Sequence, residues 1–223
     1  MGGRVETIIH KAIEALERRN SMLAAEVFTE DQIIDRLEVE IEERCVDLLA
    51  LQQPLARDLR FITAALKINN DLERVGDHAV NIAGSAVRLA ETAPLTRLEE
   101  IPRMATLAAG MLHEALDAFV GRDAATARRL VLRDDAVDQL NRQIFRALIT
   151  HMIANPATIP QAMERILVAR NLERVADLAT NIAEEVVFIA EARIIKHHAE
   201  EWSAPAAGPR KRPERPGDDF GRT

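Results

Sequence analysis

The chain has 223 residues, of which 48% are hydrophobic, 29% charged and only 3% aromatic, and its net charge is −7. This length can bury one large core or two small ones, and the aliphatic, charged composition is typical of long helices rather than of sheets. The acidic balance and the scarcity of aromatic side chains exclude a nucleic-acid binder, which needs a basic face and stacking platforms.

Helical periodicity begins near residue 4 and predicts three helices in the first half of the chain, at about 5–19, 21–53 and 54–91. The second helix must end before Pro54, because proline lacks the amide proton and clashes with the preceding turn. The third begins with that proline in its first turn. Cys45 lies in an apolar register and is predicted to be a small core residue. The predicted apolar stripe of the second helix comprises Val27, Ile34, Leu37, Ile41, Leu48 and Leu51.

Three further helices are predicted in the second half, at about 96–121, at 123–154 and from the end of a turn at 155–160 to about 201. The segment 96–99 has capping-box spacing, and Asp123 can cap the next helix. A proline-punctuated turn at 155–160 precedes the body of the last helix. Residues 203–223 are rich in proline and charge, and we expect them to form a disordered tail.

An internal repeat is the strongest feature of the sequence. Residues 72–83 recur as 172–183 with nine of twelve positions identical, and 31–37 match 134–140 at a spacing of 103. The duplication predicts an all-α protein made of two tandem three-helix bundles. We place the first domain at 1–93 and the second at 94–202.

Each predicted unit carries two pairs of carboxylates, and within each pair the residues are four apart and therefore share one helix face. Asp35 lies as far before Pro54 as Glu73 lies after it, and the same holds for Asp31 and Asp77. An antiparallel hairpin would therefore bring four carboxylates to matching heights, and the second unit repeats this arrangement about the 155–156 bond. The candidate metal ligands are Asp31, Asp35, Glu73, Asp77, Asp134, Asp138, Glu173 and Asp177, with Asn81 and Asn181 as candidate additional ligands.

Crowded carboxylates repel one another, and hard cations such as Mg, Ca, Mn and iron offset this repulsion best. The alternative is a solvated acidic face that is partly neutralised by Arg74, Arg142 and Arg174. Histidines do not repeat between the units, so we expect structural or solvent-exposed roles for them. They are His10, His78, His113, His151, His197 and His198.

These motifs resemble those of the PhoU family. Residues 54–60 are similar to its P-x-x-x-D-L-R helix start, and 71–77 to its E-R-I/V-G-D signature, which recurs with Ala176 in place of glycine. The resemblance covers nearly all of residues 1–200. It implies two tandem bundles whose acidic motifs hold multinuclear metal clusters of iron or of divalent ions such as Mg, Mn or Zn, without an organic cofactor. It also implies a homodimer.

The resemblance further implies a negative regulator that acts when phosphate is plentiful, coupling the ATPase subunit of the phosphate ABC transporter to a sensor histidine kinase. A metal-binding helical scaffold or a metal-storage protein remains the alternative. No phosphate loop, Gly-x-Ser-x-Gly or His-Glu-x-x-His motif is present, so we predict that the protein is not an enzyme. No Glu-x-x-His pair of the ferritin type occurs either.

We expect a cytoplasmic location, with the membrane reached only through partners. The chain opens directly on an amphipathic pattern without a secretory leader, and it contains no apolar run of the ~18 residues that a membrane span needs. Nothing in the sequence predicts a phosphate-binding pocket in this protein.

Overall fold

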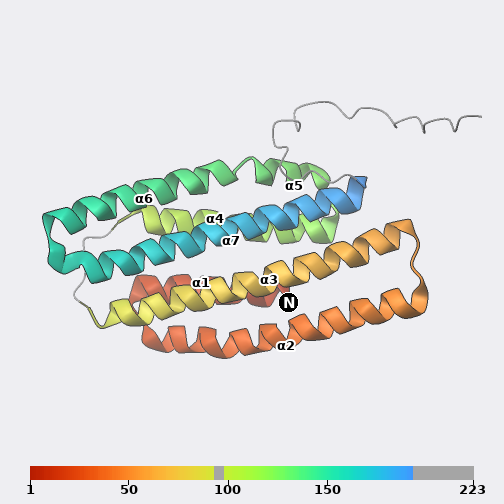
Figure 1. Ribbon diagram of the computed structural model, residues 1–223, viewed down its shortest axis with the longest axis horizontal. Coiled ribbons are helices and arrows are strands. Elements are labelled where there is room, and N and C mark those ends of the chain that lie inside the picture. The colour runs from red at the N-terminus through yellow and green to blue at the C-terminus, as the bar shows by residue number, and fades with distance from the viewer. Residues whose placement is uncertain (93–97, 193–223) are drawn as a thin grey trace, which may run out of the picture.

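A computed structural model describes residues 1–92 and 98–192 of the chain, and every regular element in these ranges is helical (Figure 1). The predicted all-α fold is confirmed. The elements are α1 (Gly2–Arg18), α2 (Ser21–Gln52), α3 (Ala56–Ala90), α4 (Glu100–Gly121), α5 (Ala124–Val131), α6 (Asp134–Ala154), the 3₁₀ helix η1 (Pro156–Thr158) and α7 (Ile159–Glu191).

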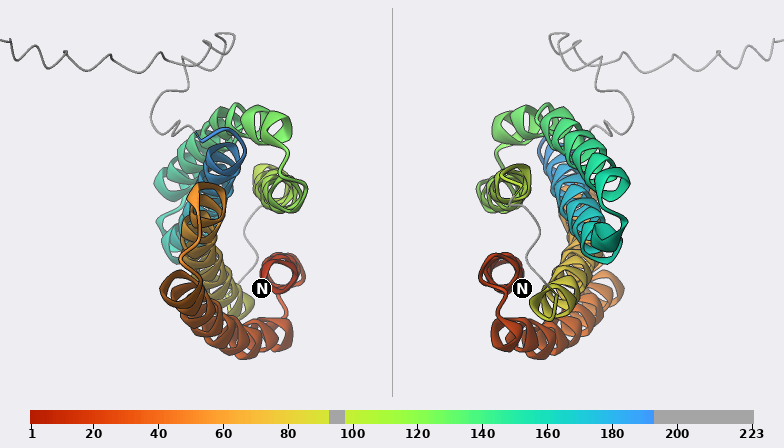
Figure 2. Two further views of the ribbon diagram at one scale, coloured as in Figure 1. Left: turned by 90° about the vertical axis from the view of Figure 1, so that its right-hand side faces the viewer. Right: turned by 90° about the vertical axis from the view of Figure 1, so that its left-hand side faces the viewer.

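The long hairpin α2–α3 lies beside the long hairpin α6–α7, and α3 and α7 run antiparallel through the middle of the molecule (Figure 1). Seen end-on, these four helices form a curved layer, with α1 and α4 on its concave side (Figure 2). The first unit is thus α1–α3, and the second is α4–α7, in which α5 and α6 together take the place of α2. None of the helices in the described ranges is long and apolar enough to cross a membrane.

The helix predicted at 123–154 is interrupted, which is a correction. Leu132 and Arg133 separate α5 from α6, whereas the matching stretch of α2 is continuous. Asp123 caps α5 as predicted, because its side chain accepts from the amides of Ala125 and Thr126 at 2.9 and 3.0 Å. As a consequence of the break, Asp134 is the first residue of α6.

Part of the predicted apolar stripe on α2 is exposed to solvent. Val27 and Ile34 are buried, and so is Cys45, but Leu48 and Leu51 are 47% and 75% exposed. The reason is the length of the covering helix: α1 has 17 residues against 32 in α2, so it spans about half of the distance. The far end of the α2–α3 hairpin is therefore not covered by α1.

The last helix ends earlier than predicted, at Glu191, where Ala192 adopts a left-handed conformation with φ 57°. The predicted domain boundary at 93–94 and the predicted tail at 203–223 lie outside the described residues.

Polar contacts join the two units along α3 and α7. Lys67 donates to both carboxylate oxygens of the buried Glu185, at 3.0 and 3.1 Å. Arg88 donates to Glu164 at 2.7 Å. These ion pairs, together with the apolar core, hold the two hairpins side by side.

Candidate functional site

In the first unit, the four predicted carboxylates come together between α2 and α3. Burial, followed by the negative charges of Asp35 and Asp77, raises the pKa of Asp31 from 3.8 to about 6. Burial also raises the pKa of Glu73, with Asp77, Asp35, Glu38 and Asp31 as further causes. These side chains therefore feel one another's charge, as the matching heights of their positions predicted.

A glycine allows Asp31 to approach α3 closely. A Cβ atom placed on Gly76 would lie 2.8 Å from Oδ1 of Asp31, which is shorter than an ordinary contact. The glycine of the sequence signature thus has a packing role, since it leaves room for a carboxylate oxygen beside the helix. In the second unit Ala176 stands at this position and is fully buried.

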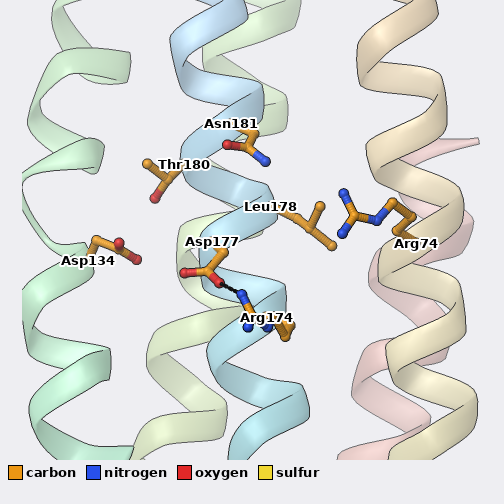
Figure 3. Close-up of a pocket in the computed structure, with 7 residues that line it drawn as sticks. All are labelled: Arg74, Asp134, Arg174, Asp177, Leu178, Thr180 and Asn181. Carbon is orange, nitrogen blue, oxygen red and sulfur yellow. Dashed lines mark hydrogen bonds and ion pairs between the residues drawn. The ribbon is translucent and has the colours of Figure 1, made fainter. Parts of the chain in front are cut away.

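In the second unit, the carboxylates meet between α6 and α7. Burial, followed by the negative charges of Asp177, Asp138, Asp135 and Glu173 in that order, raises the pKa of Asp134 from 3.8 to about 6. Oδ1 of Asp134 is buried, and no described residue forms a hydrogen bond with it. Figure 3 shows Asp134 reaching from α6 toward Asp177 on α7.

A pocket of about 300 Å³ adjoins this second cluster. Asn181, a predicted additional ligand, lines it together with Asp134 and Asp177, whereas Asn81 of the first unit is exposed on α3. Thr180 also lines the pocket (Figure 3), and its buried hydroxyl has no hydrogen-bond partner within 1–92 and 98–192. Sequence reasoning missed this threonine. Its only signal was a polar residue in the second repeat where the first has valine.

Among the described residues, arginines form ion pairs with carboxylates of the second cluster, and none forms one with the four carboxylates of the first. Arg174 pairs with Asp177 at 2.9 Å, and Arg142 lies 3.7 Å from Asp138. Arg74, the counterpart of Arg174, lies instead 3.8 Å from Asp71, outside the four-carboxylate set. The predicted neutralisation thus holds for two of the three arginines.

The donor set suits a hard cation, because carboxylate oxygens are the ligands that Mg, Mn and Ca prefer. The buried, unpartnered Oδ1 of Asp134 is an atom that such a cation would satisfy. As the side chains stand, however, no three His, Cys, Asp or Glu residues within 1–92 and 98–192 converge closely enough to hold a metal ion. Metal binding at the eight acidic residues therefore stays a prediction, supported by donor chemistry rather than by coordination geometry.

Two histidines, His78 and His113, form side-chain contacts with residues other than the predicted metal ligands. Nδ1 of His78 lies 2.9 Å from the side-chain oxygen of Asn171, across the junction of α3 and α7. His113 lies 2.6 Å from Glu6, which raises its pKa, and 3.5 Å from Asp117. Neither histidine contacts a predicted ligand in these interactions. His197 and His198 lie outside the described residues.

The PhoU domain family matches the chain twice, at residues 1–86 and 101–186. A relative from Aquifex aeolicus (strain VF5) is 43% identical over 197 residues, which cover 88% of this chain and 89% of the relative. A relative from Caulobacter vibrioides (strain NA1000 / CB15N) is 43% identical over 84% of this chain and 82% of its own length. Both are named phosphate-specific transport system accessory protein PhoU homologue.

Two solved structures have the same fold. The crystal structure of PhoU from Pseudomonas aeruginosa is similar with a TM-score of 0.85 and 38% identity, covering 86% of this chain and 93% of that one. The phosphate transport system regulatory protein PhoU from Streptococcus pneumoniae gives a TM-score of 0.80 and 30% identity, over 86% and 91% of the two chains.

Proposed function

The chain belongs to the PhoU family, and from this premise we propose that it is a negative regulator of phosphate uptake and of the phosphate-starvation response. The observation that carries the proposal is the duplicated PhoU domain, which accounts for both helical units. Relatives that match most of this chain are named accessory proteins of phosphate transport, so a role in regulating phosphate transport is the function that this similarity supports.

In this proposal the protein acts by occupying partners rather than by catalysis. It binds the ATPase subunit of the phosphate ABC transporter and a sensor histidine kinase, and biases both toward their phosphate-replete states. The long exposed faces of the two hairpins provide the surface for such contacts. The protein works in the cytoplasm as a homodimer and reaches the membrane through these partners.

We also propose that both carboxylate clusters bind cations, as multinuclear clusters of iron or of divalent ions such as Mg, Mn or Zn. A bound cation would neutralise carboxylates that now raise one another's pKa, and so stabilise the contact between the two helices of each hairpin. The ligands would be Asp31, Asp35, Glu73 and Asp77 in the first unit and Asp134, Asp138, Glu173 and Asp177 in the second, with Asn181 and Asn81 as additional donors.

Metal analysis of protein purified without an affinity tag tests cation binding. We expect at least one metal ion per chain, and a loss of metal when Glu73 and Glu173 become Gln and Asp77 and Asp177 become Asn. Metal that persists in this fourfold variant would show that it binds elsewhere. Protein that is metal-free as isolated and folds equally well in chelator would contradict cation binding.

The second candidate function is a metal-binding scaffold or a metal-storage protein without a phosphate-signalling role. It is favoured by the carboxylate clusters alone, because their chemistry needs no phosphate transporter. The two functions differ in one measurement, since a storage protein would leave phosphate-starvation genes unaffected when it is removed.

That measurement is alkaline phosphatase output in a strain that lacks the gene, grown in excess phosphate. We expect high output that returns to the repressed level when the gene is supplied. Phosphatase that stays fully repressed, in a strain without a second copy of the family, would contradict the regulatory function and leave the storage function standing.

A further inference from the structure

The strongest unassigned feature is a basic pocket of about 380 Å³ between α6 and α7. We define it by four arginines, two from each helix, together with two apolar side chains that form part of its wall. They are Arg142, Arg146, Arg170, Arg174, Phe145 and Ile166.

The four arginines form a row along the hairpin. Arg142 and Arg170 are almost equally far from the 155–156 turn, so they lie at nearly the same height. Arg146 lies about one helical turn closer to the 155–156 connection between the helices, and Arg174 lies about one helical turn farther from it. Residues four apart are separated by about 6 Å along a helix. The four arginine side chains therefore leave the helices at three successive heights, which together span about 12 Å.

Two of these arginines are available to a ligand. Arg146 and Arg170 are exposed, and no carboxylate within residues 1–92 and 98–192 forms an ion pair with either. Glu173 is the one acidic side chain among the described residues that line the pocket. The pocket therefore carries a net positive charge, although Arg142 and Arg174 also lie near carboxylates of the adjacent cluster.

The first unit lacks this pocket chemistry at the same positions. The counterparts of Arg142 and Arg146 on α2 are Val39 and Glu43, and the counterpart of Arg170 on α3 is Asn70. Phe145 is replaced by Glu42. The row of arginines is thus a property of the second unit and not a consequence of the fold.

Arginine is the side chain best suited to phosphoryl oxygens, because its planar fork donates two parallel hydrogen bonds to them. A single orthophosphate reaches guanidinium groups at about one level, whereas a chain of phosphoryl groups can contact several levels at once. Phe145 is half exposed beside the row, so an aromatic face is also available to a nucleotide base.

We propose that this pocket binds an oligophosphate anion, an ion with two or more linked phosphoryl groups. Its source is either an inorganic phosphate chain or the phosphate chain of a nucleotide. Arg146 and Arg170 supply the main contacts, and Arg142 and Arg174 extend the row. The site is independent of the regulatory role proposed above, since binding is a property of the isolated chain.

Calorimetric titration of the purified full chain tests the site, in about 0.15 M salt to screen loose surface attraction and with chelator to remove bridging cations. We expect tripolyphosphate to bind once per chain, at least tenfold more tightly than orthophosphate. Arg146→Gln/Arg170→Gln should weaken tripolyphosphate at least tenfold. The matched control Arg36→Gln/Arg44→Gln removes the same charge from exposed positions on α2 and should change the affinity less than twofold.

A titration with ATP distinguishes the two sources. ATP that binds more tightly than tripolyphosphate, and loses this advantage in Phe145→Ala, identifies a nucleotide; equal affinities identify the phosphate chain alone. Arg170→Lys, which keeps the charge but loses the fork, should have an intermediate affinity. Far-UV circular dichroism of every variant confirms that the helices are intact.

Three results would overturn the proposal. Equal losses in the Arg146/Arg170 variant and in the α2 control would show general electrostatic attraction. Binding that appears only with added divalent cation and is lost in Asp134→Asn would show that a metal ion holds the anion. Absence of binding by all of these anions would leave the arginines to an acidic protein partner.

Discussion

In the first unit Asp31 lies inside α2, beyond its first turns, and fits against Gly76. In the second unit Asp134 is the first residue of α6, and Ala176 stands in place of Gly76. Both carboxyl groups have a pKa raised to about 6, but their surroundings differ. The carboxyl group of Asp31 fits because Gly76 has no side chain. The carboxyl group of Asp134 lies at the positive end of a helix, where a negative charge is favoured.

The arginines extend this difference. In the second unit Arg174 pairs with Asp177, while in the first Arg74 lies near Asp71. The counterpart of Asp71 is Asn171, which offers Arg174 no competing charge. Duplication thus preserved the carboxylates and the hairpin register, while single substitutions beside them made the two clusters electrostatically different.

The largest expected effect concerns the contact between the units. Lys67→Met removes the ammonium group that donates to both oxygens of Glu185, whose side chain is only 4% exposed. We expect a loss of about 2 kcal/mol in the free energy of unfolding, below the usual cost for buried pairs because Lys67 is half exposed. Urea unfolding measures it. Arg44→Met, which breaks an exposed pair with Glu40, should cost less than about 0.5 kcal/mol, and equal costs would show that the inter-unit pair is unimportant.

The raised pKa values predict a pH dependence that distinguishes the two clusters. The folded state holds a proton on Asp31 up to about pH 6, whereas the unfolded state holds it only to about pH 3.8. The stronger proton binding stabilises the folded state fully below about pH 4, and this contribution is lost as pH rises through 6. In chelator at pH 7.5 we expect Asp31→Asn to be more stable than the wild type by about 1 kcal/mol, after allowance for solvent screening.

Asp134→Asn should gain less than Asp31→Asn, about 0.5 kcal/mol, because it also loses a favourable charge at the start of α6. Both gains should vanish at pH 4, and thermal unfolding at the two pH values measures them. A variant that is less stable than the wild type at pH 7.5 in chelator would contradict the repulsion between these carboxylates.

Exchanging the residues beside the acid pairs tests the role of the glycine. Ala176→Gly should destabilise the protein by about 1 kcal/mol, since glycine in a helix interior costs that much relative to alanine. Gly76→Ala gains the same helix propensity but displaces the Asp31 carboxylate, so we expect a net change within about 0.5 kcal/mol. Chemical unfolding compares the two. A full gain of about 1 kcal/mol in Gly76→Ala would mean that the carboxylate moves aside at no cost.

The smallest expected effect is a change in the carboxylate with which Arg174 forms its ion pair. Asn171→Asp gives Arg174 a second carboxylate three residues before it, as Asp71 does for Arg74. We expect the coupling between Arg174 and Asp177 to fall from about 0.5 kcal/mol to near zero. A double-mutant cycle in each background measures this coupling. An unchanged coupling would show that the residue at 171 does not select the partner.

Counting along the chain was enough to predict which acidic residues meet. Pro54 and the regular rise of the helices set the heights of Asp31 and Asp77, and the structure brings their charges within reach of each other. Thr180 could not be found in this way, because the comparison of repeats favours residues that both copies share. The exposure of Leu48 and Leu51 was missed because it depends on where the neighbouring helix α1 ends.

The sequence by itself determined the helices, the duplication, the positions of the turns and the matching heights of the carboxylates. These properties are local, since helix rise and proline geometry act within a few residues. The tertiary structure alone decided which carboxylates are buried, which arginines neutralise them and that four arginines line one pocket. Those properties depend on how each helix is rotated about its axis and on what covers it, and both are set by packing between segments far apart in the chain.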